Sequence, residues 1–107
     1  MKLLTTLTAS AMLVACAPTM ADESAKKQVC YQRAEAAATF MTARQVGRPL
    51  REVLEVLEKA DMEDLNGVAI EAFEQPRYIS SEYRENAITD FSNKKLVECL
   101  KYFKVES

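Results

Sequence analysis

The chain has 107 residues, a formal net charge of −2 and 28% charged against 49% hydrophobic residues. This length allows one small domain, and the slightly acidic balance argues against binding nucleic acid or an anionic lipid surface. The sequence contains no tryptophan and no histidine. The absence of histidine excludes Ser-His-Asp and Cys-His catalytic arrangements. We therefore expect a protein that is not an enzyme and that holds no cofactor and no metal.

The first 21 residues have the pattern of a secretory signal peptide. A positive start at Lys2 is followed by an uncharged stretch over 3–15 and by small residues that end at Ala21. The apolar run is too short, and too rich in Thr and Ser, to span a membrane. The sequence predicts a signal peptide over 1–21 and a single helical domain over 22–107, located in the periplasm or secreted.

A second reading of the same segment stays open. Leu13-Val14-Ala15-Cys16 resembles a bacterial lipobox, in which Cys16 becomes the lipidated first residue after a lipoprotein signal over 1–15. No Asp follows Cys16, so this alternative implies an outer-membrane lipoprotein. The domain would then contact a membrane only through its lipid anchor.

Of the three cysteines, Cys16 is either removed with the signal peptide or lipidated. Cys30 and Cys99 remain in both forms of the mature chain. An even count in an exported chain indicates a disulfide. Closing a loop of roughly 70 residues contributes about 4 kcal/mol in the chain-entropy model, which is comparable with the whole stability of a small domain. Since no Cys-x-x-Cys motif and no zinc-ligand spacing is present, we predict a structural bond between Cys30 and Cys99.

The apolar periodicity of the first half of the domain predicts two helices. The first runs from about Ser24 to Val46, and Gly47 suits its left-handed cap. Pro49 fits the first turn of a second, short helix. The apolar positions of these helices are Cys30, Ala34, Ala37, Phe40, Met41 and Val46, then Leu50, Val53, Leu54, Leu57 and Ala60.

The second half predicts two further helices and no strand. Asp61 is expected to cap the third helix, which ends before Pro76. Ser80 or Ser81 caps the last helix, which runs to about Lys104 with a weak point at Ser92-Asn93. The expected inward positions are Leu65, Val68, Ala69, Ile70 and Phe73, then Ile88, Phe91, Leu96, Cys99, Leu100 and Phe103. The fold class is all-α, a compact bundle of about four helices with one disulfide between the first and the last.

An acidic run over 52–64 invites a metal-site interpretation. Its carboxylates change face along the second helix, however, and basic residues stand four positions away from them, so we interpret the run as an ion-paired surface. The acidic residues are Glu52, Glu55, Glu58, Asp61, Glu63 and Asp64, and the basic residues are Arg48, Arg51 and Lys59.

The loop that follows the third helix is the candidate binding element. Pro76 is rigid, and it presents Arg77 and Tyr78, two residue types common in interface hot spots. Arg44 is a candidate to lie beside this loop. The alternative is structural: the ring of Tyr78 lies on the bundle, and Arg77 pairs with a carboxylate such as Glu82 or caps a helix end.

The chain also resembles a group of small exported proteins from proteobacteria and their phages. The resemblance rests on the frame Cys30, Arg44-x-x-Gly47-x-Pro49-Leu50, Ala72-Phe73-x-x-Pro76-Arg77-Tyr78, Phe91 and Cys99. In layout alone the chain is similar to phage envelope proteins that exclude superinfecting phage, including lysozyme inhibitors. The first group has no assigned function to carry over. We interpret the chain as a non-enzymatic binding module with an envelope protein as its partner, acting as an inhibitor or exclusion factor. An envelope-stress chaperone and an accessory subunit of an envelope enzyme are the alternatives.

Overall fold

The computed structural model describes the backbone of residues 18–105 and the side chains of 22–105. The candidate lipidation residue Cys16 and the apolar run of the predicted signal peptide lie outside the described residues. Within them the chain is helical and contains no strand. The elements are α1 (Pro18–Gln45), α2 (Leu50–Lys59), the 3₁₀ turn η1 (Glu63–Leu65), α3 (Asn66–Phe73) and α4 (Ser81–Tyr102).

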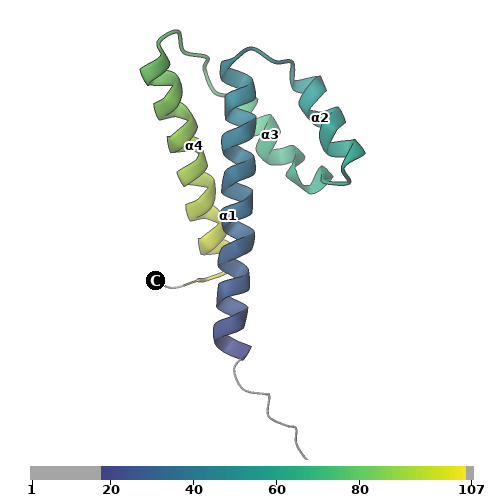
Figure 1. The fold of residues 1–107 in the computed structure, drawn as a ribbon, viewed down its shortest axis with the longest axis vertical. Coiled ribbons are helices and arrows are strands. Elements are labelled where there is room, and N and C mark those ends of the chain that lie inside the picture. The colour runs from purple at the N-terminus through teal and green to yellow at the C-terminus, as the bar shows by residue number, and fades with distance from the viewer. Residues whose placement is uncertain (1–17, 106–107) are drawn as a thin grey trace, which may run out of the picture.

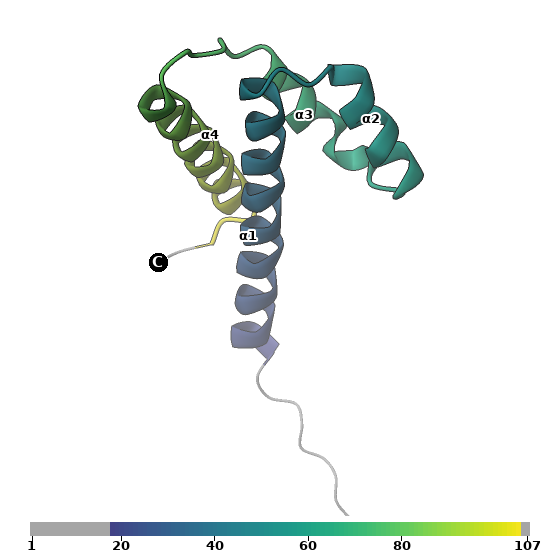
Figure 2. The same ribbon diagram turned by 45° about the horizontal axis from the view of Figure 1, so that its top comes forward.

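Helix α1 is the central element of the bundle (Figure 1). Helix α4 runs back along one side of it, while α2 and α3 lie on the other side, as the turned view also shows (Figure 2). A disulfide joins Cys30 of α1 to Cys99 of α4, with the two Cα atoms 5.5 Å apart. The predicted all-α bundle with a disulfide between the first and last helices is confirmed.

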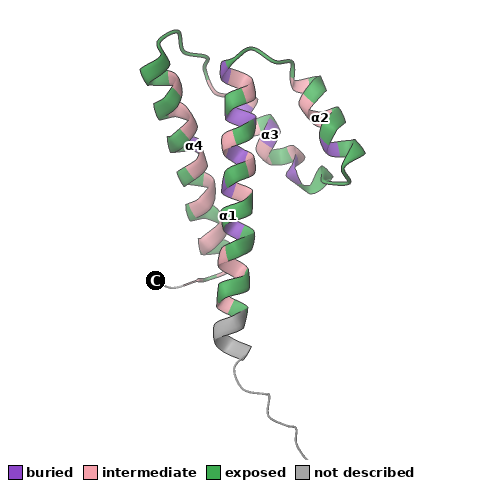
Figure 3. Ribbon diagram, viewed as in Figure 1, coloured by how far each residue is buried: buried purple, intermediate pink, exposed green. Residues whose placement is uncertain are grey.

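The buried residues of α1 follow the predicted apolar stripe, except at the C-terminal end of the helix (Figure 3). Gln45 is 1% exposed, whereas Val46 is 60% exposed. Position 45 comes four residues after the buried Met41 and so continues the same face, while position 46 is rotated away from it. The prediction that Val46 points inward is wrong. The buried apolar residues are Cys30, Ala34, Ala37, Phe40, Met41, Leu57, Leu65, Ala69, Ala72 and Phe91.

The helix ends are closed by local hydrogen bonds. At the end of α1, Gly47 has a φ of 90°, and the amide of Arg48 donates to the carbonyl of Ala43 at 2.9 Å, which confirms the predicted glycine cap. Asp61 takes the equivalent place after α2, with a φ of 58°. It therefore ends α2 and does not cap the third helix as predicted. Ser80 caps α4, since its hydroxyl accepts from the amide of Tyr83.

Two further details of α3 and α4 differ from expectation. Ile70 is 42% exposed, because Ala69 and Ala72 occupy the buried face of this short helix. Helix α4 continues unbroken through the expected weak point at Ser92-Asn93. There the hydroxyl of Ser92 donates to the carbonyl of Ala34 at 2.8 Å and ties α4 to α1. None of the described helices is long and apolar enough to cross a lipid bilayer.

Candidate functional site

The segment Gln75–Tyr78 between α3 and α4 is fixed by two neighbouring side chains of α1. The Nε of Arg44 donates to the carbonyl of Gln75 at 2.8 Å, so Arg44 lies beside the loop. The amide group of Gln45 donates from Nε2 to the carbonyl of Pro76 and accepts at Oε1 from the amide of Tyr78, each at 2.8 Å. A single buried side chain thus replaces the backbone partners that this irregular segment lacks.

Helix α4 holds the other side of the same loop. The Nε of Arg84 donates to the carbonyl of Tyr78 at 2.8 Å. The carbonyls of Gln75, Pro76 and Tyr78 therefore each accept a hydrogen bond from a side chain of α1 or α4. A loop held in this way is ordered before any partner arrives, which lowers the entropic cost of binding.

Gln45 and Arg84 are functional candidates that the sequence analysis missed. Gln45 could have been found, because it continues the stripe of Ala37 and Met41 at helical spacing. A polar residue at a predicted core position must find a hydrogen-bond partner when it is buried. Arg84 carries no such signal, since an arginine in the first turns of an exposed helix is ordinary.

The side chain of Arg77 lies over the C-terminal end of α1. A Cβ placed on Gly47 would come within 2.9 Å of Nη2 of Arg77. The C-terminal end of a helix attracts a cation, since its last carbonyls carry partial negative charge. Arg77 forms no ion pair within the described residues, so the suggested pair with Glu82 is not formed.

Around this loop, large apolar side chains are exposed. Ile79 is 93% exposed, Tyr83 is 61% exposed and Tyr78 is 38% exposed. The rings of Tyr78 and Tyr83 meet edge to face, with their centroids 6.2 Å apart. We call Arg77, Tyr78, Ile79 and Tyr83 the loop surface.

Beside the loop surface is a hollow of about 210 Å³ between the loop and α4. Tyr78 lines it together with Pro76, Met41 and Phe91. Tyr78 thus lies partly against the bundle, where it lines the hollow, and partly in solvent. Ile79, in contrast, is almost fully exposed and is not needed for packing.

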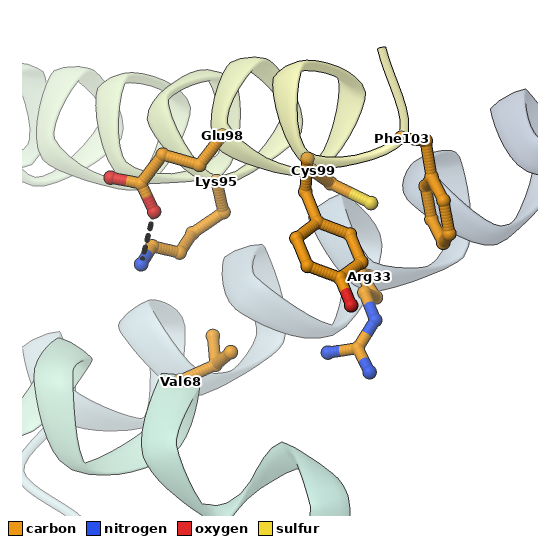
Figure 4. Close-up of a pocket in the computed structure, with 7 residues that line it drawn as sticks. Arg33, Val68, Lys95, Glu98, Cys99 and Phe103 are labelled. Atoms are coloured by element: carbon orange, nitrogen blue, oxygen red, sulfur yellow. Dashed lines mark ion pairs between the residues drawn. The ribbon is translucent and has the colours of Figure 1, made fainter. Parts of the chain in front are cut away.

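A second hollow, of about 330 Å³, lies between α1, α3 and the end of α4 beside the disulfide (Figure 4). The charged groups that line it are already paired. Lys95 bonds to Glu98 at 2.7 Å and to Glu71 of α3, and Arg33 bonds to Asp64 at 3.1 Å. The three charged residues of this lining, Arg33, Lys95 and Glu98, thus each have an ion-pair partner.

The pair between Glu71 and Lys95 links α3 to α4, and Lys94 adds a second contact to Glu71 at 3.3 Å. The hydrogen bond from Lys95 holds the pKa of Glu71 below its usual value, although partial burial opposes this shift. Burial lowers the pKa of Lys95, but its hydrogen bonds to Glu71 and Glu98 outweigh that effect and raise the pKa above its usual value. Both groups are charged at neutral pH.

The acidic run behaves as a charged surface. Glu52 pairs with Arg48 at 2.6 Å, as predicted. Arg51 and Lys59 form no ion pair with any described residue. Within the described part of the chain, no three His, Cys, Asp or Glu side chains converge as a metal site would require.

No protein-family model, curated protein or solved structure matches this chain. The resemblance to small exported two-cysteine proteins stays a prediction.

Proposed function

We propose that this chain is an exported, non-enzymatic protein of the bacterial cell envelope that binds another envelope protein through the loop surface. The observation that carries the proposal is the exposed Ile79 beside Tyr78 and Tyr83, on a loop whose backbone is fixed by Gln45 and Arg84. The few residues that contribute most of the binding energy at protein interfaces are enriched in tyrosine and arginine. A fixed backbone reduces the conformational entropy lost when a partner binds.

Export is supported by the sequence before residue 22 and by the disulfide between Cys30 and Cys99, because such bonds persist in oxidising compartments. The intact mass of protein recovered from an exporting bacterium tests this part. We expect a chain that starts at Asp22 or at a lipidated Cys16. Recovery of the chain with Met1 still present would contradict both forms of processing.

Ile79→Ser is the sharpest test of the binding surface. Since Ile79 is 93% exposed, its replacement should change stability by less than about 0.5 kcal/mol. Loss of an interface anchor typically weakens binding by about tenfold or more. We expect the variant to lose capture of an envelope protein from a cell-envelope extract while its denaturation midpoint stays unchanged.

Val97→Ser is the matched control, because Val97 is also exposed and lies in the last two turns of α4, away from the loop. It should capture the same protein as the unmodified chain does. Equal capture by Ile79→Ser and the unmodified chain, or equal loss in both variants, would refute the loop surface as the binding site.

Arg77→Ala distinguishes binding from a structural role at the end of α1. If Arg77 contacts the partner, capture weakens by about tenfold or more, and the denaturation midpoint is nearly unchanged. A large loss of the midpoint with unchanged binding per folded molecule would assign Arg77 to the fold.

A further inference from the structure

The two cysteines of the disulfide have different surroundings. Cys30 of α1 is 0% exposed, whereas Cys99 of α4 is partly exposed. Cys99 also lines the hollow of about 330 Å³ between α1, α3 and the end of α4, and Cys30 is not among the residues that line it. A reagent that approaches the folded protein from solvent therefore meets Cys99 and not Cys30.

The hollow leaves room for a side chain of another molecule beside Cys99. Its volume is at the lower end of the range typical of small-molecule pockets. Val68 of α3 lies across the hollow from Cys99 (Figure 4). Tyr102 lines the same hollow and is 80% exposed, so the core does not depend on it.

The end of α4 depends on the disulfide for its attachment to α1. Phe91 is the one buried residue of α4 among those that the structure describes. After it, Ser92 bonds to α1 and Lys95 bonds to α3. From residue 96 to residue 105, no side-chain hydrogen bond or ion pair reaches another helix within the described part of the chain, and the bond of Cys99 is the remaining link.

A thiolate opens a disulfide by attacking one sulfur and displacing the other. Here one thiolate of a dithiol attacks Sγ of Cys99 and forms a mixed disulfide, and Cys30 leaves as a thiolate that takes up a proton. The second thiolate of the dithiol then attacks its own first sulfur and displaces Cys99. Two electrons pass to the protein, which ends with two thiols, while the dithiol becomes a disulfide.

From the unequal exposure of the two cysteines, we infer that Sγ of Cys99 is a thiol–disulfide exchange site, at which a dithiol reductant opens the bond and releases residues 96–105 from α1. The partner is thus a protein dithiol, of the kind that Cys-x-x-Cys motifs provide. Neither cysteine belongs to the main apolar cluster around Phe40 and Met41, so that cluster stays packed when the bond opens. This inference depends on the disulfide and not on the loop surface.

Glutathione, a monothiol, tests which sulfur is attacked. The oxidised protein is exposed to it briefly under native conditions, the freed thiol is capped with N-ethylmaleimide, and the peptides are mapped by mass spectrometry. We expect glutathione on Cys99 and maleimide on Cys30, in about tenfold excess over the reverse pattern. In strong urea, which exposes both cysteines, the two patterns should approach equality. Glutathione mainly on Cys30, or the same mixture in both conditions, would overturn the inference.

Two substitutions test the hollow as the route to Cys99. Tyr102→Ala should widen it, and dithiothreitol should then reduce the native protein about threefold faster. Val68→Trp should fill it and slow the reduction about tenfold. The matched controls are Tyr83→Ala and Val97→Trp, at exposed positions of α4 that do not line the hollow, and both should react like the unmodified chain.

In urea all of these variants should be reduced at the same rate. Native rates that follow the unfolding free energies of the variants, and not the width of the hollow, would assign the reduction to global unfolding and overturn the inference. Tyr102→Ala decides alone if Val68→Trp does not fold.

Hydrogen exchange tests the release of the end of α4. In protein kept reduced, the amides of 96–105 should exchange nearly as fast as in an unfolded chain, because few contacts hold them. The amides around Phe40 and Met41 should stay protected and exchange at least about tenfold more slowly. Loss of protection in both regions, or equal protection of both, would overturn the release.

Discussion

Replacing Gln45 by methionine should destabilise the fold more than its conservative size suggests. The change removes two hydrogen bonds of 2.8 Å to the loop, at the carbonyl of Pro76 and the amide of Tyr78. Each is worth about 1 kcal/mol, and leaving the loop groups without a partner adds to this, so we expect a loss of about 2–4 kcal/mol. Methionine keeps most of the side-chain volume, and packing therefore contributes little to the loss.

Urea unfolding of the oxidised protein measures this effect. Gln28→Met, the same substitution at an exposed position of α1, is the control and should change the unfolding free energy by less than about 0.5 kcal/mol. Hydrogen exchange at the amide of Tyr78 should become faster in Gln45→Met alone. If Gln45→Met matches its control in both measurements, the idea that this amide fixes the loop is refuted.

Three further predictions concern the fold. Non-reduced mass spectrometry should show Cys30 linked to Cys99, and reduction should cost roughly 4 kcal/mol of stability, seen as a clear fall in melting temperature; an unchanged melting temperature would contradict this. Gly47→Ala should lower the free energy of unfolding by about 1–2 kcal/mol, because the φ of Gly47 is 90°. Gly67→Ala should raise it by about 0.5 kcal/mol, because the space around Gly67 is open. Effects of the same sign would refute the role of Gly47 as a helix cap. The pKa of Glu71 is lowered in the fold. The stability that Glu71 contributes is therefore present above about pH 4.5 and is lost as the pH falls through the folded pKa. In urea unfolding measured against pH, Glu71→Gln should lose less stability in acid than the unmodified protein does.

The sequence was sufficient to predict the helices, because their signals are local. Apolar spacing placed the inner face of α1, and Gly47 and Ser80 marked a helix end and a helix start. Asp61 was assigned to the wrong helix for a physical reason. Aspartate favours helix N-caps and also tolerates positive φ, so the residue alone does not distinguish a start from an end.

The errors in α3 and the loop arise from contacts that are distant in sequence. In α3, apolar residues occupy several sides of an eight-residue helix, so only packing on α1 decides that Ala72 is buried and Ile70 exposed. The loop hydrogen bonds of Gln45 join residues 31 and 33 positions apart. No local pattern reports such pairs. Their one sequence signal is a polar residue on an apolar stripe.

The composition of the core explains why the disulfide and Gln45 matter so much. Four of the ten buried apolar residues that the structure describes are alanines, and each of them buries little area. Small side chains let α3 and α4 come close to α1, but they provide limited hydrophobic stabilisation. A covalent link and a buried amide supply part of what the core lacks. Helix α1 therefore does more than form the core, since Gln45 near its end also fixes the loop.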